Sequence, residues 1–310
     1  MKRSPIALFT LLLTFLLAAC GGAPAAQSPT HPPAPTTVAT TVPTVADTAA
    51  PTDASTIVAS PTAATVAPRA AAGTTTLNVF AAVSLTDAFK ALAPAFEAAH
   101  PGVTVVYNFA GAQQLAAQIN EGAPADVFAS ANQKQIDVVI ASAKVISGTA
   151  QIFVRNRLVV ITPKANPAGI ASLKDLAKPG LKLIFEAKAV PAGQYSLDFL
   201  TKASKLPEYT TTYSSTVLAN VVSYEDNVRS VLSKIVLGEG DAGIVYTTDA
   251  ATEADKIGTV TIPDELNIIA LYPIAPLVES KVPDLAKAFI AYVLSPEGQQ
   301  VFVKYGFLLP

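Results

Sequence analysis

A serine stands where a predicted strand ends and a predicted helix begins. The residues Leu77–Ala82 are apolar and predict a buried strand. Ser84 follows at the expected N-cap, and Asp87 three residues later gives a Ser-x-x-acid pattern that is typical of a capping box. A helix N-terminus leaves free N–H groups and a positive dipole end. The pattern therefore indicates either a helix cap alone or a hydroxyl placed beside an anion site.

Three further predicted helices begin with an uncharged residue after a loop. The residues at these starts are Ala112, Ala192 and Val228. Gly111 and Gly193 stand beside two of them and allow a ligand to approach the backbone closely. Tyr246 adds a phenolic donor at the end of the predicted strand Ala242–Tyr246. Because none of these positions carries a charge, the set favours a small oxyanion held by neutral donors and helix ends.

Strand-like and helix-like runs alternate along residues 74–310, and this alternation positions the candidate residues. A βαβα order predicts α/β architecture, with mostly parallel sheets flanked by helices. In open α/β sheets, the loops after the carboxyl ends of the strands line the ligand crevice. The helix starts named above follow loops of this kind, so we expect these residues to converge on one ligand crevice.

Composition excludes several kinds of site. The chain has 310 residues, one cysteine, two histidines, and 21 basic against 23 acidic residues. This mildly acidic balance without a basic cluster argues against nucleic acid as a partner. His31 lies in a low-complexity segment and His100 precedes a Pro-Gly turn. Zinc sites and Ser/His or Cys/His triads therefore lack the residues they need, and the chain is not expected to be an enzyme.

The first 73 residues predict an export signal and a spacer. Lys2 and Arg3 precede an apolar core at residues 6–17, and residues 17–20, LAAC, read as a lipobox. Residues 1–19 are therefore predicted to be a signal peptide, and Cys20 resembles the lipid-modified first residue of a bacterial lipoprotein. The alternative is an ordinary signal peptide that happens to end near a cysteine. Residues 20–73, rich in Ala, Pro and Thr, predict a disordered linker whose glycosylation stays open.

Several motifs along the folded part resemble one family. They are VFAAVSLTDAF, FAGAQQLAAQI, GAPADVFASAN, VPAGQY, NVRSVL, GDAGIVYTTDA and the closing YGFLLP. In this order they resemble the periplasmic molybdate-binding proteins of ABC transporters, over essentially all of residues 77–310. Single pieces such as GAPADVF occur more widely among periplasmic binding proteins, whereas the full ordered set is specific.

The resemblance implies a two-lobed class II binding-protein fold with two hinge crossovers. It places the oxyanion contacts at Ser84, Ala112, Ala192, Val228 and Tyr246, with molybdenum or tungsten held only through its oxygens and no direct metal ligand. Many members of the family have serine where this chain has Ala112, so one hydroxyl is missing. We expect weakened or rearranged binding, with Gln113 or a water as the compensating donor.

The resemblance also implies the domain plan and the role. Residues 74–157 and 274–310 are expected to form the first lobe and residues 158–273 the second, with Leu158–Thr162 and Leu271–Val278 as hinge strands. The implied function is extracytoplasmic capture of molybdate or tungstate by a membrane-anchored monomer, which needs no cofactor and delivers its ligand to an ABC permease. The alternative is a binding protein for another tetrahedral oxyanion, such as sulfate or thiosulfate. The preferred metal and the open or closed state are left undetermined.

Overall fold

The computed structural model describes residues 74–145 and 147–310, which belong to one compact unit. The predicted signal peptide at residues 1–19, the lipidation site at Cys20 and the linker at residues 20–73 lie outside the described residues. Within the described part, no helix is both long and apolar enough to cross a membrane.

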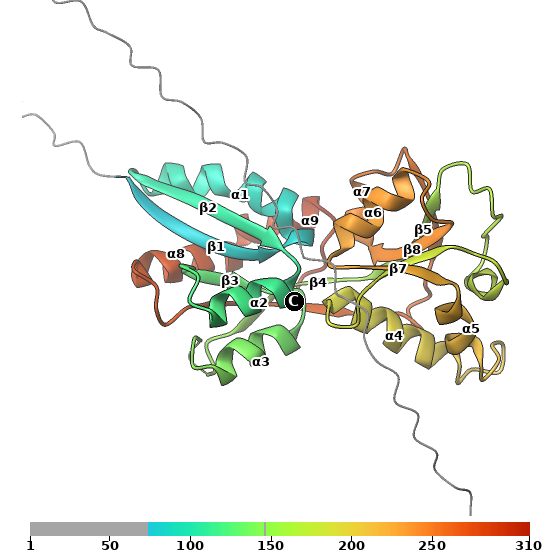
Figure 1. Ribbon diagram of the computed structural model, residues 1–310. Helices are drawn as coiled ribbons and strands as arrows, with labels where there is room; N and C mark the ends of the chain where they lie inside the picture. Colours follow the sequence, from blue (N-terminus) through green and yellow to red (C-terminus); the bar gives the residue numbers. More distant parts are fainter. Residues whose placement is uncertain (1–73, 146) are drawn as a thin grey trace, which may run out of the picture. The chain divides into compact units, whose positions relative to one another are not determined.

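The described residues form two sheets of five strands each (Figure 1). The first sheet has the order β2-β1-β3-β10-β4. Its strands are β1 (Thr75–Ala82), β2 (Val103–Ala110), β3 (Val127–Ala129), β4 (Gln151–Asn156) and β10 (Ala270–Pro276). The second sheet has the order β7-β6-β8-β5-β9. Its strands are β5 (Leu158–Pro163), β6 (Leu183–Glu186), β7 (Val221–Glu225), β8 (Ala242–Tyr246) and β9 (Ile257–Thr261).

Each sheet has a parallel part and an antiparallel part. β1 pairs in parallel with β2 and β3, and β6 pairs in parallel with β7 and β8. β10 runs antiparallel to β3 and β4, while β5 runs antiparallel to β8 and β9. These antiparallel strands join the sheets, because β4 leads into β5 and β9 leads back to β10. The predicted α/β fold with two crossovers is confirmed.

The expected lobe boundary at residues 273/274 is wrong by a few residues. β10 pairs with β4 from Ala270 onward, and Leu271 lies opposite Arg155, so the whole strand belongs to the first sheet. Only Arg157 separates β4 from β5, and residues 262–269 form the return segment. We call the first sheet with the helices that cover it the first lobe, and the second sheet with the helices that cover it the second lobe.

Helices cover both faces of the first sheet. They are α1 (Thr86–Ala99), α2 (Ala112–Asn120), α3 (Gln133–Ala141), α8 (Pro283–Leu294) and α9 (Pro296–Lys304). Side chains alternate along β1: Val79 packs into the core that includes α1, whereas Phe80 packs into a smaller cluster with α2 and α3. Phe89 of α1 meets Phe289 and Phe302 edge-on, with ring centroids 6.0 and 5.6 Å apart. This aromatic packing fixes α1 behind the end of β1.

Four α-helices belong to the second lobe: α4 (Pro191–Ala203), α5 (Tyr213–Ala219), α6 (Val228–Val236) and α7 (Thr247–Ala251). α4 and α6 lie on opposite sides of the second sheet (Figure 1). α6 approaches β8 closely because Gly243 has no side chain: a Cβ there would lie 2.6 Å from Cγ1 of Val231. This close packing holds the start of α6 near the carboxyl end of β8, where Tyr246 lies.

Candidate ligand-binding site

A small cavity lies where the carboxyl ends of the parallel strands of both sheets meet. Its wall is formed by residues 82–84, 110–112 and 190–192, with Ala131, Asn227, Val228 and Tyr246. All five residues that the sequence predicted, Ser84, Ala112, Ala192, Val228 and Tyr246, are in this wall. The cavity has a volume of about 20 Å³. A cavity of this size suits a small ion and is far smaller than a typical organic cofactor site.

Ser84 does not cap α1, contrary to the capping-box prediction. It lies in a short 3-10 helix, η1 (Val83–Leu85), and Leu85 occupies the N-cap of α1 without a side-chain cap. The extra turn moves the helix start past the serine. The Ser84 hydroxyl is buried and lies 3.0 Å from the Tyr272 hydroxyl of β10. It is therefore free of a capping role and lies in the cavity wall.

Three helices begin at the cavity wall. Ala112 is the first residue of α2, Ala192 the second residue of α4, and Val228 the first residue of α6. N–H groups in the first turn of a helix have no carbonyl partner within that helix. In α6, the side chain of Asn227 accepts from the N–H of Ser230 at 3.0 Å, so the earlier N–H groups stay uncapped. The three helix ends supply backbone donors and positive dipole ends.

Tyr246 provides a buried hydroxyl. It ends β8, is 1% exposed, and its hydroxyl makes no hydrogen bond of acceptable geometry with a described residue, although the hydroxyl of Tyr272 lies near enough to interact with it. Burial raises the pKa of this phenol well above its ordinary value, so it keeps its proton at neutral pH. A buried donor without an acceptor is costly. An anion in the cavity would supply the acceptor.

Among the described residues, no charged side chain lines the cavity. Arg229, which follows Val228, is directed to two carboxylates: Nε lies 2.5 Å from Asp249 and an Nη atom lies 2.7 Å from Asp87. Burial raises the pKa of Asp249 to about 6, although Arg229 favours its ionised form. The described residues contain no group of three His, Cys, Asp or Glu that could hold a metal ion. The positive character of the cavity therefore comes from neutral dipoles.

Polar bonds join the two lobes beside the cavity. Nε2 of Gln113 donates to the carbonyl oxygen of Asp226 at 2.8 Å, and Nε2 of Gln135 donates to that of Ala189 at 3.3 Å. Of the two compensating donors expected for the missing serine hydroxyl, Gln113 donates to Asp226 in this bridge and does not line the cavity, which leaves a water as the alternative. The bridges and the Arg229–Asp87 pair hold the two halves of the wall together.

Two nearby residues were missed from the sequence. Glu186 ends β6 and is 2% exposed, and neither carboxyl oxygen has a hydrogen-bond partner among the described residues. Burial, together with Asp249 and Glu225, raises its pKa well above the ordinary value, which favours a neutral carboxyl group. A glutamate at the end of an otherwise apolar strand is unusual, so Glu186 could have been selected as a candidate from the sequence. Tyr272 gave no signal, since an aromatic residue in a strand is ordinarily a core residue.

Comparison with known proteins identifies the family. Residues 77–308 match the model of the bacterial extracellular solute-binding proteins. The chain belongs to this family. It is 37% identical to the molybdate-binding protein ModA of Mycobacterium tuberculosis H37Rv over 238 residues, which are 77% of this chain and 86% of that protein. The corresponding protein of Escherichia coli K12 is 33% identical over 250 residues, 79% of this chain and 93% of that protein.

Solved structures agree with the observed fold. The substrate-binding domain of a putative molybdenum ABC transporter from Clostridium difficile is 29% identical, with a TM-score of 0.57, over 76% of this chain and 99% of that one. A sulfate-binding protein from Synechococcus elongatus is a more distant relative, 23% identical over 218 residues. The resemblance to molybdate-binding proteins of ABC transporters is confirmed. The family consists of extracytoplasmic binding proteins of transporters, and its members are not enzymes.

Proposed function

We propose that this protein binds molybdate or tungstate in the cavity between its lobes and delivers the ion to an ABC permease. The observation that carries the proposal is the composition of the wall. It combines the buried hydroxyl of Tyr246, the hydroxyl of Ser84 and three helix N-termini, and no charged side chain of the described residues takes part in it. A fully deprotonated tetrahedral dianion has only acceptor oxygens, and this wall offers it donors.

In this proposal the five wall residues have distinct roles. Ser84 and Tyr246 donate from their hydroxyl groups. Ala112, Ala192 and Val228 mark the backbone donors at the starts of α2, α4 and α6. A carboxylate in the wall would repel the ion and would find no proton to accept. The wall therefore disfavours oxyanions that are protonated at neutral pH, such as phosphate.

Closure follows from the same geometry. Ser84 and Ala112 come from the first lobe, and Ala192, Val228 and Tyr246 from the second. A ligand that contacts both sets favours the state in which the lobes meet. We place the hinge at the two connections between the sheets, at Arg157 and at residues 262–269.

Thermal unfolding with added oxyanions tests the ligand. Molybdate and tungstate should each raise the midpoint, because a ligand at 100 times its Kd stabilises the folded state by about 2.7 kcal/mol. Sulfate, thiosulfate and phosphate serve as comparisons at the same concentration. Equal or larger stabilisation by sulfate would contradict the molybdate proposal in favour of a sulfate-type binding protein. Elemental analysis of the purified protein for molybdenum and tungsten gives a second, independent reading.

We further propose that the mature protein is a monomer tethered by a lipid on Cys20. The lipobox at residues 17–20 and the Ala/Pro/Thr-rich residues 20–73 support this proposal. The full chain, expressed in a bacterium, should partition into the detergent phase of a phase-separation assay. Cys20→Ser should move it to the aqueous phase or leave it with an uncleaved signal peptide. Partition of both proteins into the aqueous phase would refute the anchor.

A further inference from the structure

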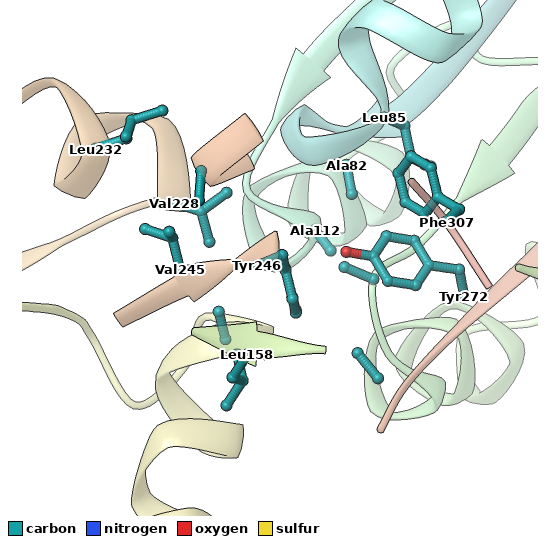
Figure 2. Packing of buried hydrophobic residues seen from close by; sticks show 14 of the residues in the cluster. Ala82, Leu85, Ala112, Leu158, Val228, Leu232, Val245, Tyr246, Tyr272 and Phe307 are labelled. Carbon is teal, nitrogen blue, oxygen red and sulfur yellow. The ribbon is translucent and has the colours of Figure 1, made fainter. Parts of the chain in front are cut away.

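Tyr272 lies directly behind Ser84, outside the cavity wall. It belongs to β10, is fully buried, and its hydroxyl oxygen lies 3.0 Å from Oγ of Ser84. Its ring meets the ring of Tyr246 at an interplanar angle of 63°, with centroids 5.7 Å apart. Figure 2 shows the Tyr272 hydroxyl pointing from β10 toward Ala112 and Tyr246. Tyr272 itself is not in the cavity wall, and its hydroxyl contacts Ser84, which is.

Asn156, Tyr272 and Ser84 form a chain of hydrogen bonds, and the orientation of the Asn156 amide can be assigned. Its Oδ1 accepts from the backbone N–H of Arg157 at 2.9 Å and from the Thr247 hydroxyl at 3.1 Å. Because a backbone N–H can only donate, the oxygen must face Arg157 and the NH₂ group must face the other way. Nδ2 then donates to Oγ1 of Thr248 at 2.8 Å and makes a long contact of 3.5 Å with Oη of Tyr272.

The Tyr272 hydroxyl has one proton to donate, and Ser84 is in place to accept it. A hydroxyl has one proton and two lone pairs. Oη of Tyr272 receives an N–H from Asn156, lies 3.0 Å from Oγ of Ser84, and also interacts with the hydroxyl of Tyr246. Burial raises the pKa of Tyr272 well above its ordinary value, so the phenol keeps its proton and can donate it. When Ser84 accepts that proton, its own proton is directed elsewhere, and the cavity lies next to it.

We propose that Tyr272 is a positioning residue that commits the Ser84 proton to the ligand, so that Ser84 acts only as a donor. This inference rests on the proposed oxyanion function and extends it to specificity. A protonated oxyanion such as hydrogen phosphate needs an acceptor for its proton, and Ser84 held in this way offers none. The chain of bonds also begins at Asn156, the last residue of β4, beside the connection between the lobes.

Tyr272→Phe tests the proposal because it keeps the ring and removes one oxygen. Titration calorimetry should show molybdate affinity reduced about two- to tenfold, the range for one net hydrogen bond. The affinity ratio of molybdate to phosphate should also fall, since Ser84 can then turn and accept a proton. In a Ser84→Ala background, Tyr272→Phe should have little further effect on either value. Additive losses, or a single variant with unchanged affinity and ratio, would overturn the proposal.

Tyr213→Phe is the matched control. Tyr213 is also buried, and its hydroxyl donates to the carbonyl of Leu173 in the second lobe, away from the cavity. It should leave affinity and the molybdate-to-phosphate ratio unchanged. If Tyr272→Phe is poorly folded, the affinity ratio of molybdate to phosphate still tests the proposal, because this ratio does not depend on the fraction of folded protein. Wild-type protein that binds neither molybdate nor tungstate would refute the proposed function and this inference together. Wild-type binding with an unchanged Tyr272→Phe variant refutes this inference alone.

Discussion

The guanidinium of Arg229 in α6 lies 2.7 Å from the carboxylate of Asp87 in α1, and this ion pair joins the two lobes. Arg229 is also bound to Asp249 within its own lobe, at 2.5 Å. Asp249 is fully buried, whereas the Asp87 side chain is 41% exposed. The pair with Asp249 therefore fixes Arg229 within the second lobe. The pair with Asp87 forms only when the lobes meet.

Asp87→Asn should weaken ligand binding without changing the second lobe. The ion pair contributes to the closed state alone, and its half-exposed position limits it to a surface-type contribution. We expect molybdate affinity to fall about two- to fivefold at low ionic strength, with a smaller difference at high salt because ions screen the pair. Calorimetric titration at two salt concentrations measures both effects. Asp284→Asn is the control, since Asp284 is 98% exposed and pairs within its own helix with Lys287. Equal changes in both variants would argue against a lobe-joining role.

Gly111→Ala should hinder closure while sparing the fold. Gly111 has φ −59°, which alanine adopts without strain. A Cβ at this position would, however, lie 2.5 Å from the carbonyl oxygen of Asp226 in the opposite lobe. The lobes would have to separate to relieve the contact. We expect the unfolding midpoint of the ligand-free protein to stay within about 2 °C of wild type. The rise in midpoint on adding molybdate should be largely lost, and an undiminished rise would show that the lobes tolerate the extra carbon.

The convergence of the five candidate residues on one cavity was predictable because the signals are local. The residues Ser84, Ala112, Ala192, Val228 and Tyr246 each follow or end a strand, and a parallel α/β sheet brings such positions to one edge. Details that depend on contacts distant in sequence were not predictable. The Ser84 capping box failed because η1 precedes α1. Gln113 binds Asp226, 113 residues away, and nothing near Gln113 in sequence indicates that partner.

The strand β7, Val221–Glu225, carries little strand signal in its own sequence. β7 is the edge strand of the second sheet, and its Val222 and Tyr224 are 60% and 55% exposed. Apolar residues facing solvent remove the alternation that would mark a half-buried strand. The lobe boundary at residues 273/274 was misplaced for another reason. β10 is irregular between Tyr272 and Pro273, and the sheet that it joins is decided by pairing with β4, which its own sequence does not encode.

Ala112→Ser should restore a side-chain hydroxyl to the cavity. Ala112 is 1% exposed and stands in the wall at the first position of α2. A hydroxyl there can donate to the ligand, and a charge-assisted hydrogen bond is worth about 1.5–3 kcal/mol when well aligned. We expect molybdate affinity to rise about tenfold, measured by calorimetric titration. Ala117→Ser, on the exposed face of the same helix, is the control and should change nothing. A lower affinity for Ala112→Ser would mean that the small cavity has no room for the added oxygen.

Glu186→Gln should alter how stability depends on pH. Burial raises the pKa of the Glu186 carboxyl well above its ordinary value, and Asp249 and Glu225 add to the shift. The folded state then keeps a proton that the unfolded state releases above about pH 4.3. The free energy of unfolding of the wild type should fall as pH rises from this value toward the folded pKa, by at most about 1.4 kcal/mol per pH unit from this group. Glutamine carries no such proton, so the free energy of unfolding of Glu186→Gln lacks this decline with rising pH.

The midpoint of Glu186→Gln minus that of wild type should therefore increase as the pH of the thermal unfolding experiment rises from about 5 toward the folded-state pKa of Glu186. Glu297→Gln, at an exposed position in the first turn of α9, should show a difference that does not grow with pH. A difference that is constant for Glu186→Gln as well would mean that Glu186 is ionised in the folded state. The cavity would then have a negative charge close to Tyr246, which would oppose a dianion. A neutral Glu186 removes that opposition, so the same titration also tests the electrostatic basis of the proposed oxyanion site.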